Sequence, residues 1–230
     1  MVGTSVPETQ ADVRSWWVLH FTHLDNLPSI VATGALTCDW RARQGPMQTE
    51  VGDAAIKDAR RRRPVPVGPG GTVGDYVPFY FGPRSPMMYR ISCDCRDAVP
   101  GRYHGGNRPL VYLAARIGTI LDSGPAWVAT DGNARAVITR FTTDLDELTA
   151  MIDWPLMRAK MWNSTPEDPD RERRRMAELL VHLRAPLALF HEVAVYSETY
   201  AARVRVALGD HPLAQRVSVR PQWYYGLERR

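Results

Sequence analysis

The chain has 230 residues, of which 44% are hydrophobic and 23% are charged, a composition typical of a globular protein rather than a disordered one. It contains no run of about 18 apolar residues, so we expect no helix that spans a membrane. The formal net charge of +4 is compatible with nucleic-acid binding but does not by itself indicate it.

Residues 1–12 are polar and lack the basic start and apolar middle of a signal peptide. The three cysteines, Cys38, Cys93 and Cys95, cannot all pair with one another. Cys93 and Cys95 also have no second cysteine pair with which to hold zinc. We therefore expect a cytoplasmic protein with free thiols and no bound metal.

The first element expected along the chain is a strand at residues 16–22, where alternate side chains are suited to opposite faces. A short helix follows at residues 28–33. Asp25 or Asn26 can cap its start, and Gly34 is a stop signal at its end.

Residues 48–63 are predicted to form the next helix, which ends at Pro64 because proline cannot continue it. The Pro/Gly-rich loop at residues 65–74 is of a kind that more often carries function than links domains. A strand at residues 76–81 follows, and a turn then leads to residues 87–92.

The second half of the chain contains further apolar strand candidates, at residues 110–114, 127–130, 179–181, 193–196 and 217–219. A helix is predicted at residues 197–208, and residues 142–175 are rich in charge and in helix formers. This mixed order, without regular alternation of strands and helices, favours an α+β fold.

Arginines form two clusters, at residues 60–63 and at Arg171, Arg173, Arg174 and Arg175. Each cluster alone is also what an ordinary solvated helix face would carry. The two would have to converge in space to form a phosphate-binding surface.

No P-loop, Gly-rich dinucleotide fingerprint, zincin helix or nucleophile elbow is present, so a nucleotide would not bind here in the Rossmann manner. His20 and Thr22 share one face of the first predicted strand. An isolated histidine on such a strand is usually a core residue. Together, however, the two would place hydrogen-bonding groups on an apolar wall, which suits a ribose hydroxyl or a carboxamide.

Glu178 lies between a charged helix-like segment and an apolar strand, and its spacing allows two interpretations. It could be a helix-surface carboxylate paired with Arg174 or Arg175, worth a few tenths of a kcal/mol. Alternatively, it could enter a cleft at the start of the strand. There a carboxylate would stabilise the oxocarbenium ion that forms when a nicotinamide–ribose bond breaks.

Several segments together resemble the DarT family of DNA ADP-ribosyltransferase toxins. The most specific is Val-Pro-Phe-Tyr-Phe-Gly-Pro-Arg-Ser-Pro-Met-Met-Tyr at residues 77–89. The other matching segments, in family order, are His20-Phe21-Thr22 with Asn26-Leu27, Ala177-Glu178-Leu179-Leu180-Val181, and Trp223-Tyr224-Tyr225. The resemblance extends from about Trp17 to Tyr225.

The resemblance implies an α+β ADP-ribosyltransferase fold, in which a split β-sheet holds NAD⁺ in a central cleft. We expect a single such domain at residues 16–230, preceded by a flexible N-terminus at residues 1–15. By position in the family pattern, the NAD⁺-binding residues are His20, Phe21, Thr22, Ser29, Thr37 and Arg60. Glu178 and Arg60 correspond to the catalytic residues, and residues 144–178 to the region that reads DNA.

The implied activity is that of a toxin in a toxin–antitoxin pair. It transfers ADP-ribose from NAD⁺ to a base, thymidine in the most similar branch, in single-stranded DNA and releases nicotinamide. The implied partners are single-stranded DNA and a DarG-type macrodomain antitoxin, and the arginine clusters would contact DNA phosphates. Two other functions remain open, an ADP-ribosyltransferase that modifies protein side chains and a nucleic-acid-binding module with a vestigial cleft.

Arg60 has been assigned the role of proton acceptor in this family, but a neutral guanidine is scarce near pH 7. Our hypothesis is that Arg60 instead stabilises the deprotonated base or orients the NAD⁺ diphosphate, and that solvent accepts the proton.

Overall fold

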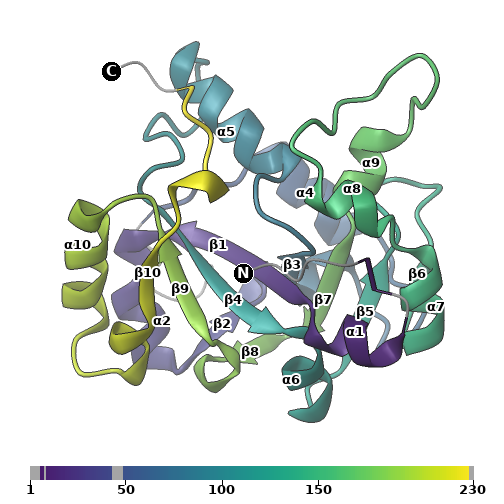
Figure 1. Cartoon of the computed structure of the whole chain (residues 1–230), viewed down its shortest axis with the longest axis horizontal. Helices are drawn as coiled ribbons and strands as arrows, with labels where there is room; N and C mark the ends of the chain where they lie inside the picture. The colour runs from purple at the N-terminus through teal and green to yellow at the C-terminus, as the bar shows by residue number, and fades with distance from the viewer. Residues whose placement is uncertain (1–5, 8, 43–48, 228–230) are drawn as a thin grey trace.

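The structure, a computed structural model, describes residues 6–7, 9–42 and 49–227. Its centre is a mixed sheet (Figure 1) whose strands are, in spatial order, β10 (Val217–Val219), β9 (Glu192–Val195), β4 (Leu110–Arg116), β1 (Trp17–His23), β3 (Tyr76–Tyr80), β7 (Glu178–His182), β5 (Trp127–Thr130) and β6 (Phe141–Thr142). Only the β9–β10 pair is parallel in this sheet. A small second sheet pairs β2 (Ala35–Thr37) with β8 (Arg184–Pro186).

The large sheet splits between β1 and β3. These strands share one registered pair, Leu19 with Tyr80, whereas β1 pairs with β4 along its whole length. Beyond that pair the side chain of His20, through ring Nδ1, contacts the carbonyl oxygen of Pro78 at 2.9 Å. Pro78 has no N–H with which to continue a ladder, so a central strand tolerates it only where pairing is interrupted. The predicted split sheet is therefore present.

Helices cover the sheet on several sides (Figure 1). α2 (Leu27–Thr33) packs against α10 (Glu198–Leu208), which lies along β9 and β10. α1 (Gln10–Ser15) contacts both α6 (Ile117–Asp122) and α7 (Leu145–Met151). Strand β4 is buried along nearly its full length, and the core is built around it.

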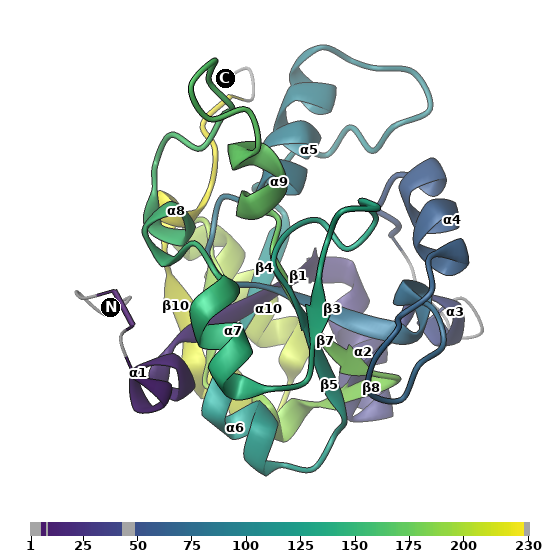
Figure 2. The same ribbon diagram turned by 90° about the vertical axis from the view of Figure 1, so that its right-hand side faces the viewer.

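The remaining helices surround the end of the sheet where it splits. α5 (Pro86–Arg96) lies at the top of Figure 1, with α8 (Trp154–Arg158) and α9 (Arg171–Arg175) to its right. Figure 2 shows α3 (Asp39–Ala42) and α4 (Ala54–Arg62) on the side that is turned away in Figure 1. Short 3₁₀ turns complete the fold, η1 (Leu24–Asn26), η2 (Val73–Asp75), η3 (Leu187–Leu189), η4 (Pro212–Arg216) and η5 (Pro221–Trp223).

Most predicted strands and helices are present within one or two residues of their expected bounds, but three expectations need correction. The predicted helix at residues 48–63 begins only at Ala54, after Asp53 caps it, and residue 48 lies outside the described residues. Asn26 stands at the N-cap of α2 but makes no capping hydrogen bond. Within the N-terminus that we expected to be flexible, residues 10–15 form α1, which a Thr9–Asp12 capping box starts.

Residues 87–92, for which no helix or strand was predicted, belong to α5. Its start carries both standard signals, because the Ser85 side chain accepts from the Met88 N–H and Pro86 occupies the first turn.

Candidate active site

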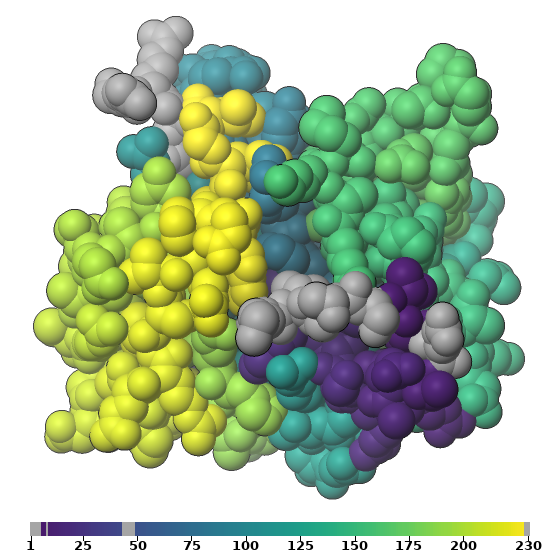
Figure 3. Space-filling model, viewed as in Figure 1, coloured from purple at the N-terminus to yellow at the C-terminus, as the bar shows by residue number. Residues whose placement is uncertain are grey.

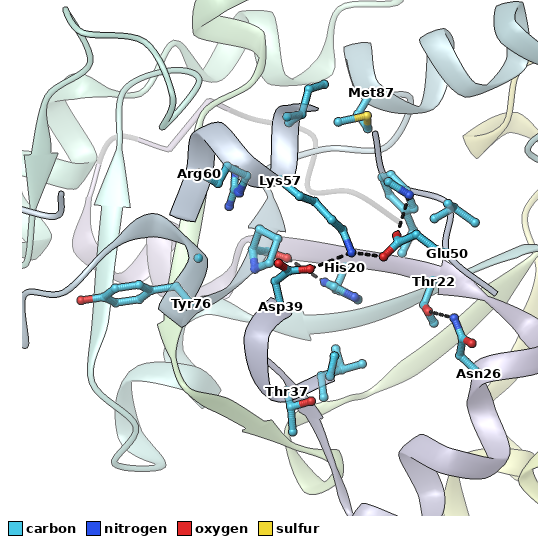
Figure 4. A pocket seen from close by; sticks show the side chains of 18 of the residues that line it. His20, Thr22, Asn26, Thr37, Asp39, Glu50, Lys57, Arg60, Tyr76 and Met87 are labelled. Carbon is cyan, nitrogen blue, oxygen red and sulfur yellow. Dashed lines mark hydrogen bonds and ion pairs between the residues drawn. The ribbon is translucent and has the colours of Figure 1, made fainter. Parts of the chain in front are cut away.

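A cavity of ≈ 320 Å³ lies where the sheet splits, between β1, β3 and β7 and under α4. Figure 4 shows side chains from several of these elements pointing into it. The structure brings all the site residues that the sequence predicts to its walls, namely His20, Phe21, Thr22, Ser29, Thr37, Arg60 and Glu178. Residues 158 positions apart in the sequence thus line one cavity.

Glu178 is the first residue of β7 and is 2% exposed. Its backbone N–H donates to the Thr130 hydroxyl at 3.0 Å, which fixes the start of the strand. Its carboxylate pairs with Arg60, whose Nη1 lies 2.9 Å from each of the two oxygens. The helix-surface interpretation of Glu178 is therefore wrong, because the carboxylate is buried and its partner lies on another element.

Arg60 stays charged in this arrangement. Burial lowers the pKa of its guanidinium, but the nearby Glu178 carboxylate outweighs this and leaves the pKa of Arg60 raised above its ordinary value. While Nη1 holds Glu178, the other terminal nitrogen, Nη2, is buried without a hydrogen-bond partner. The guanidinium thus has one donor group committed to the carboxylate and one available for a bound molecule.

His20 stays neutral. Burial lowers its pKa from 6.5 to about 4. Because the Pro78 carbonyl oxygen can only accept, the ring proton sits on Nδ1, and the neutral ring leaves Nε2 as an acceptor. An acceptor on a cavity wall is what a ribose hydroxyl requires.

The neighbours of His20 give the wall its shape. The Phe21 ring stacks on Tyr80, with centroids 6.1 Å apart and an interplanar angle of 13°. The Thr22 hydroxyl accepts from the Asn26 side chain at 3.2 Å. Asn26 also holds the backbone of Thr49 at 2.9 and 3.0 Å, so instead of capping α2 it fixes the chain that leads into α4.

Helix α4 is held over the cavity at both ends. At its start, the Asp53 carboxylate accepts from the backbone N–H of Ala55 at 2.8 Å and pairs with Arg90 at 2.9 Å. Nearer its end, Gly74 lies so close that a Cβ there would be 2.9 Å from Cγ of Arg61. These contacts hold Arg60, the residue before Arg61, against Glu178.

Comparison with known proteins decides the family. A model described as "ssDNA thymidine ADP-ribosyltransferase, DarT" matches residues 19–225. This chain belongs to the DarT family.

Relatives and solved structures agree with this assignment. The chain is 37% identical to a DNA ADP-ribosyl transferase of Mycobacterium tuberculosis, over 92% of this chain and 90% of that protein. It is also 37% identical to a DNA ADP-ribosyl transferase of Thermus sp., over 90% of this chain and 95% of that protein. The structure of Thermus sp. 2.9 DarT in complex with ADP-ribosylated ssDNA is similar with a TM-score of 0.82, 36% identity and coverage of 92% and 97%. The structure of Thermus sp. 2.9 DarT in complex with NAD⁺ is similar with a TM-score of 0.79 and 34% identity. The match covers 96% of this chain and 100% of that chain.

These matches confirm the predicted DarT family and α+β fold. They also confirm the enzyme class, a DNA ADP-ribosyltransferase, with NAD⁺ as its co-substrate.

The cavity also contains a cation, Lys57, that was not predicted from the sequence. Lys57 Nζ lies 2.7 Å from Asp39 and also pairs with Glu50, so that it bridges two walls of the cavity (Figure 4). Lys57 precedes Arg60 by three positions on a predicted helix, a spacing that puts both on one face. That spacing was the available signal. Asp39 and Glu50 lie in separate segments, and no sequence pattern pointed to either of them.

The arginine clusters are mostly committed to internal ion pairs. Arg61 pairs with Asp39, Arg173 with Asp131 and Asp170, and Arg174 with Asp153 and Asp168. The clusters do approach one another, because Arg63 donates to the Ala136 and Val137 carbonyls in the middle of the loop between β5 and β6, and Arg173 donates to Asp131 at the start of that loop. A guanidinium group that is already paired with a carboxylate is less available to a DNA phosphate, and the phosphate contacts of these clusters stay a prediction.

Within residues 6–7, 9–42 and 49–227, no group of three or more His, Cys, Asp or Glu side chains is placed to hold a metal ion. In the same part of the chain, no helix is long and apolar enough to cross a membrane. Cys38 and Cys93 are free thiols.

Proposed function

We propose that Glu178 and Arg60 together carry the transfer of ADP-ribose from NAD⁺ to thymidine in single-stranded DNA. The observation that supports this most is their buried pair on the wall of a cavity that also presents the neutral ring of His20. In such a pair the carboxylate can stabilise a positive charge that develops on the substrate, and the guanidinium can stabilise a negative one.

NAD⁺ would bind with its nicotinamide ribose against β1. His20 Nε2 accepts from a ribose hydroxyl, and the Phe21–Tyr80 stack offers an aromatic wall to the nicotinamide ring. Thr22, Ser29 and Thr37 line the rest of the cavity and supply hydroxyl groups along the bound nucleotide.

The bond that breaks joins C1 of this ribose to the nicotinamide nitrogen, and its electron pair leaves with neutral nicotinamide. The ribose then carries the positive charge of an oxocarbenium-like transition state. Glu178, by accepting a hydrogen bond from the ribose 2-hydroxyl and facing this charge, lowers the barrier.

The bond that forms joins C1 to the ring nitrogen on the pairing edge of thymine, which loses its proton to solvent. The free Nη2 of Arg60 would donate to a thymine carbonyl oxygen beside that nitrogen and stabilise the anion as it forms. The same edge is hidden in a duplex, which accounts for a single-stranded substrate.

The test is incubation of the purified protein with NAD⁺ and separate pools of single-stranded oligonucleotides, duplex DNA and protein, scored by mass. We expect an ADP-ribose mass increment on thymidine-containing single strands and equimolar free nicotinamide. Increment on protein alone, or on strands that lack thymidine, would contradict the proposal.

We also propose that the protein acts in the cytoplasm as the toxin of a toxin–antitoxin pair, with a DarG-type macrodomain protein as partner. Support comes from family membership. Induced expression in a bacterial host should stop growth, and co-expression of the macrodomain protein should restore growth and remove ADP-ribose from DNA. Growth arrest that persists in a Glu178→Gln variant would contradict the toxin role assigned to transfer.

A further inference from the structure

On its β5 side, Glu178 is held by a side chain rather than by the strand ladder. The β5–β7 register ends with Ala129 opposite Leu179. At the next position the Glu178 backbone N–H donates to the Thr130 hydroxyl at 3.0 Å, and this hydroxyl donates to the Gly132 carbonyl oxygen at 2.8 Å. Both Thr130 and Glu178 are buried, so loss of the hydroxyl would leave the Glu178 N–H unpaired away from water.

A second set of contacts holds the chain just before β7, at Arg173 in α9. Its Nη1 lies 3.0 Å from the Asp131 carboxylate and 3.3 Å from the Thr139 hydroxyl, both in the loop that follows β5. Its Nε and Nη2 donate to Asp170 at 2.7 Å. Its carbonyl oxygen accepts from the Asn133 N–H at 3.0 Å. Arg173 therefore connects α9 to the turn after β5 through its side chain and its backbone.

The turn at residues 130–133 packs closely against Arg173. A Cβ at Gly132 would clash with Nη1 of Arg173 and would lie 3.0 Å from the Arg173 carbonyl oxygen. Any larger residue at Gly132 would displace the guanidinium from Asp131. The glycine thus permits a close approach between two segments that are distant in the sequence.

Only one turn of chain separates Arg173 from Glu178. The Met176 N–H donates to the Arg173 carbonyl oxygen at 3.1 Å. The Ala177 N–H donates to the Arg174 carbonyl oxygen at 3.0 Å, and Glu178 follows. Figure 3 shows the preceding α8–α9 segment at the surface of the molecule, in green at the upper right. The contacts with residues 130–133 therefore fix the chain between this surface segment and β7.

The Glu178 carboxylate has little freedom once its backbone is placed. The residue is 2% exposed, and both carboxylate oxygens lie 2.9 Å from Nη1 of Arg60. A shift at the start of β7 would change this pair and the distance from the carboxylate to a bound ribose. Misplacement of a reacting group by about 1 Å can slow a reaction about a hundredfold.

We propose that Thr130 and Arg173 are positioning residues for ADP-ribose transfer, which fix where β7 begins and hence where the Glu178 carboxylate lies. Neither of them lines the cavity, so they act through Glu178 and not on NAD⁺. This inference rests on the proposed function, because it names what holds the proposed catalytic carboxylate in place.

The first test removes the Thr130 hydroxyl. Thr130→Val deletes it at nearly constant volume, whereas Thr130→Ser keeps it. The matched control is Thr142→Val on the neighbouring strand β6, because the Thr142 hydroxyl is also buried and also accepts from a backbone N–H, that of Asp144 at 2.9 Å. The measurements are the transfer rate at saturating NAD⁺ and DNA, the KM for each substrate, and the melting temperature.

Thr130→Val should transfer about 10–100-fold more slowly than the wild type, with the KM for each substrate within about twofold. Thr130→Ser should stay within about threefold of the wild-type rate, because its hydroxyl can still accept from the Glu178 N–H. Thr142→Val should lower the melting temperature about as much as Thr130→Val does and leave the transfer rate unchanged.

The second test removes the Arg173 guanidinium and decides the question also where Thr130→Val does not fold. Arg173→Met should slow transfer about tenfold at an unchanged KM for DNA. The double variant should lose less than the product of the two single losses, because both residues act on one turn. The control is Arg140→Met, since Arg140 also pairs with Asp131, at 3.1 Å, but has a side chain that is 70% exposed. It should transfer at the wild-type rate.

The inference is overturned if Thr130→Val transfers as fast as Thr142→Val, or if Thr130→Ser is as slow as Thr130→Val. A raised KM for DNA at an unchanged rate in Arg173→Met would also overturn it, because Arg173 would then be a DNA contact. Glu178→Gln in the same assay separates the two proposals. If Glu178→Gln is slow while Thr130→Val is normal, this inference alone fails. If Glu178→Gln transfers normally, the proposed function fails with it.

Discussion

One nitrogen of Arg60, Nη1, lies 2.9 Å from both carboxylate oxygens of Glu178, although the two residues are 118 positions apart. The pair joins α4 to the start of β7. The carboxylate keeps Arg60 charged, because it raises the pKa of the guanidinium. Substrate must therefore use a carboxylate and a guanidinium that are already paired and already oriented.

Glu178→Gln should lower the rate of ADP-ribose transfer by about 10²–10³-fold, because the amide keeps the shape of the side chain but removes the charge that faces the oxocarbenium ion. NAD⁺ binding should persist in this variant and in Glu178→Ala. Single-turnover transfer to an oligonucleotide and calorimetric titration with NAD⁺ measure the two effects. The control is Glu172→Gln, an exposed glutamate six residues earlier. Wild-type transfer by Glu178→Gln would remove Glu178 from the mechanism.

Arg60→Lys should bind NAD⁺ yet transfer poorly, about 10²-fold or more below the wild type. A lysine ammonium cannot present the two separate donors of the planar guanidinium, one toward Glu178 and one toward the substrate. Initial rates at saturating NAD⁺ and DNA measure the loss, with Arg62→Lys on the exposed face of the same helix as control. Near-normal transfer by Arg60→Lys would show that only a positive charge is needed.

Local patterns predicted the strands well, because alternation of apolar residues depends only on neighbours in the chain. β5 (Trp127–Thr130) and β10 (Val217–Val219) have their predicted bounds. Signals for α1 and α5 were equally local, at Thr9 with Asp12 and at Ser85 with Pro86, and reading the caps would have located both helices.

The site depended on contacts that no local pattern contains. The spacing of Glu178 fitted both a surface ion pair and a position in a cleft. Its place among the segments that resemble the family favoured the cleft, and its ion pair with the distant Arg60 agrees with that interpretation. Lys57 forms ion pairs with both Asp39 and Glu50, and the three residues come from three separate segments. Such an arrangement exists only after the chain has folded, so neither acid could be identified beforehand.

The neutral state of His20 gives a pH dependence of stability. Its pKa is about 4 in the folded protein and 6.5 in an ordinary environment, so between these values the unfolded chain binds the proton and the folded chain does not. The free energy of unfolding contributed by His20 is therefore complete above pH 6.5 and falls as the pH drops toward 4, by about 3 kcal/mol in all.

Urea unfolding at pH 4.5 and 7 measures this difference. His20→Gln should reduce it, whereas replacement of the exposed His104 by Gln should leave it as in the wild type. An unchanged difference in His20→Gln would mean that the ring is not held neutral by the fold.

Substitution of Lys57 distinguishes a role in binding NAD⁺ from a role in stabilising the fold. It lines the cavity between Asp39 and Glu50, and a diphosphate entering the cavity needs a cation that can exchange carboxylates for phosphate oxygens. Lys57→Met should therefore raise the KM for NAD⁺ by about tenfold, with a smaller change in kcat. Arg61→Met is the matched control, because Arg61 also pairs with Asp39 but does not line the cavity. It should lower the melting temperature without changing the KM for NAD⁺. If both variants lose stability alike and neither changes the KM, the bridge through Lys57 holds the fold together and does not bind the co-substrate.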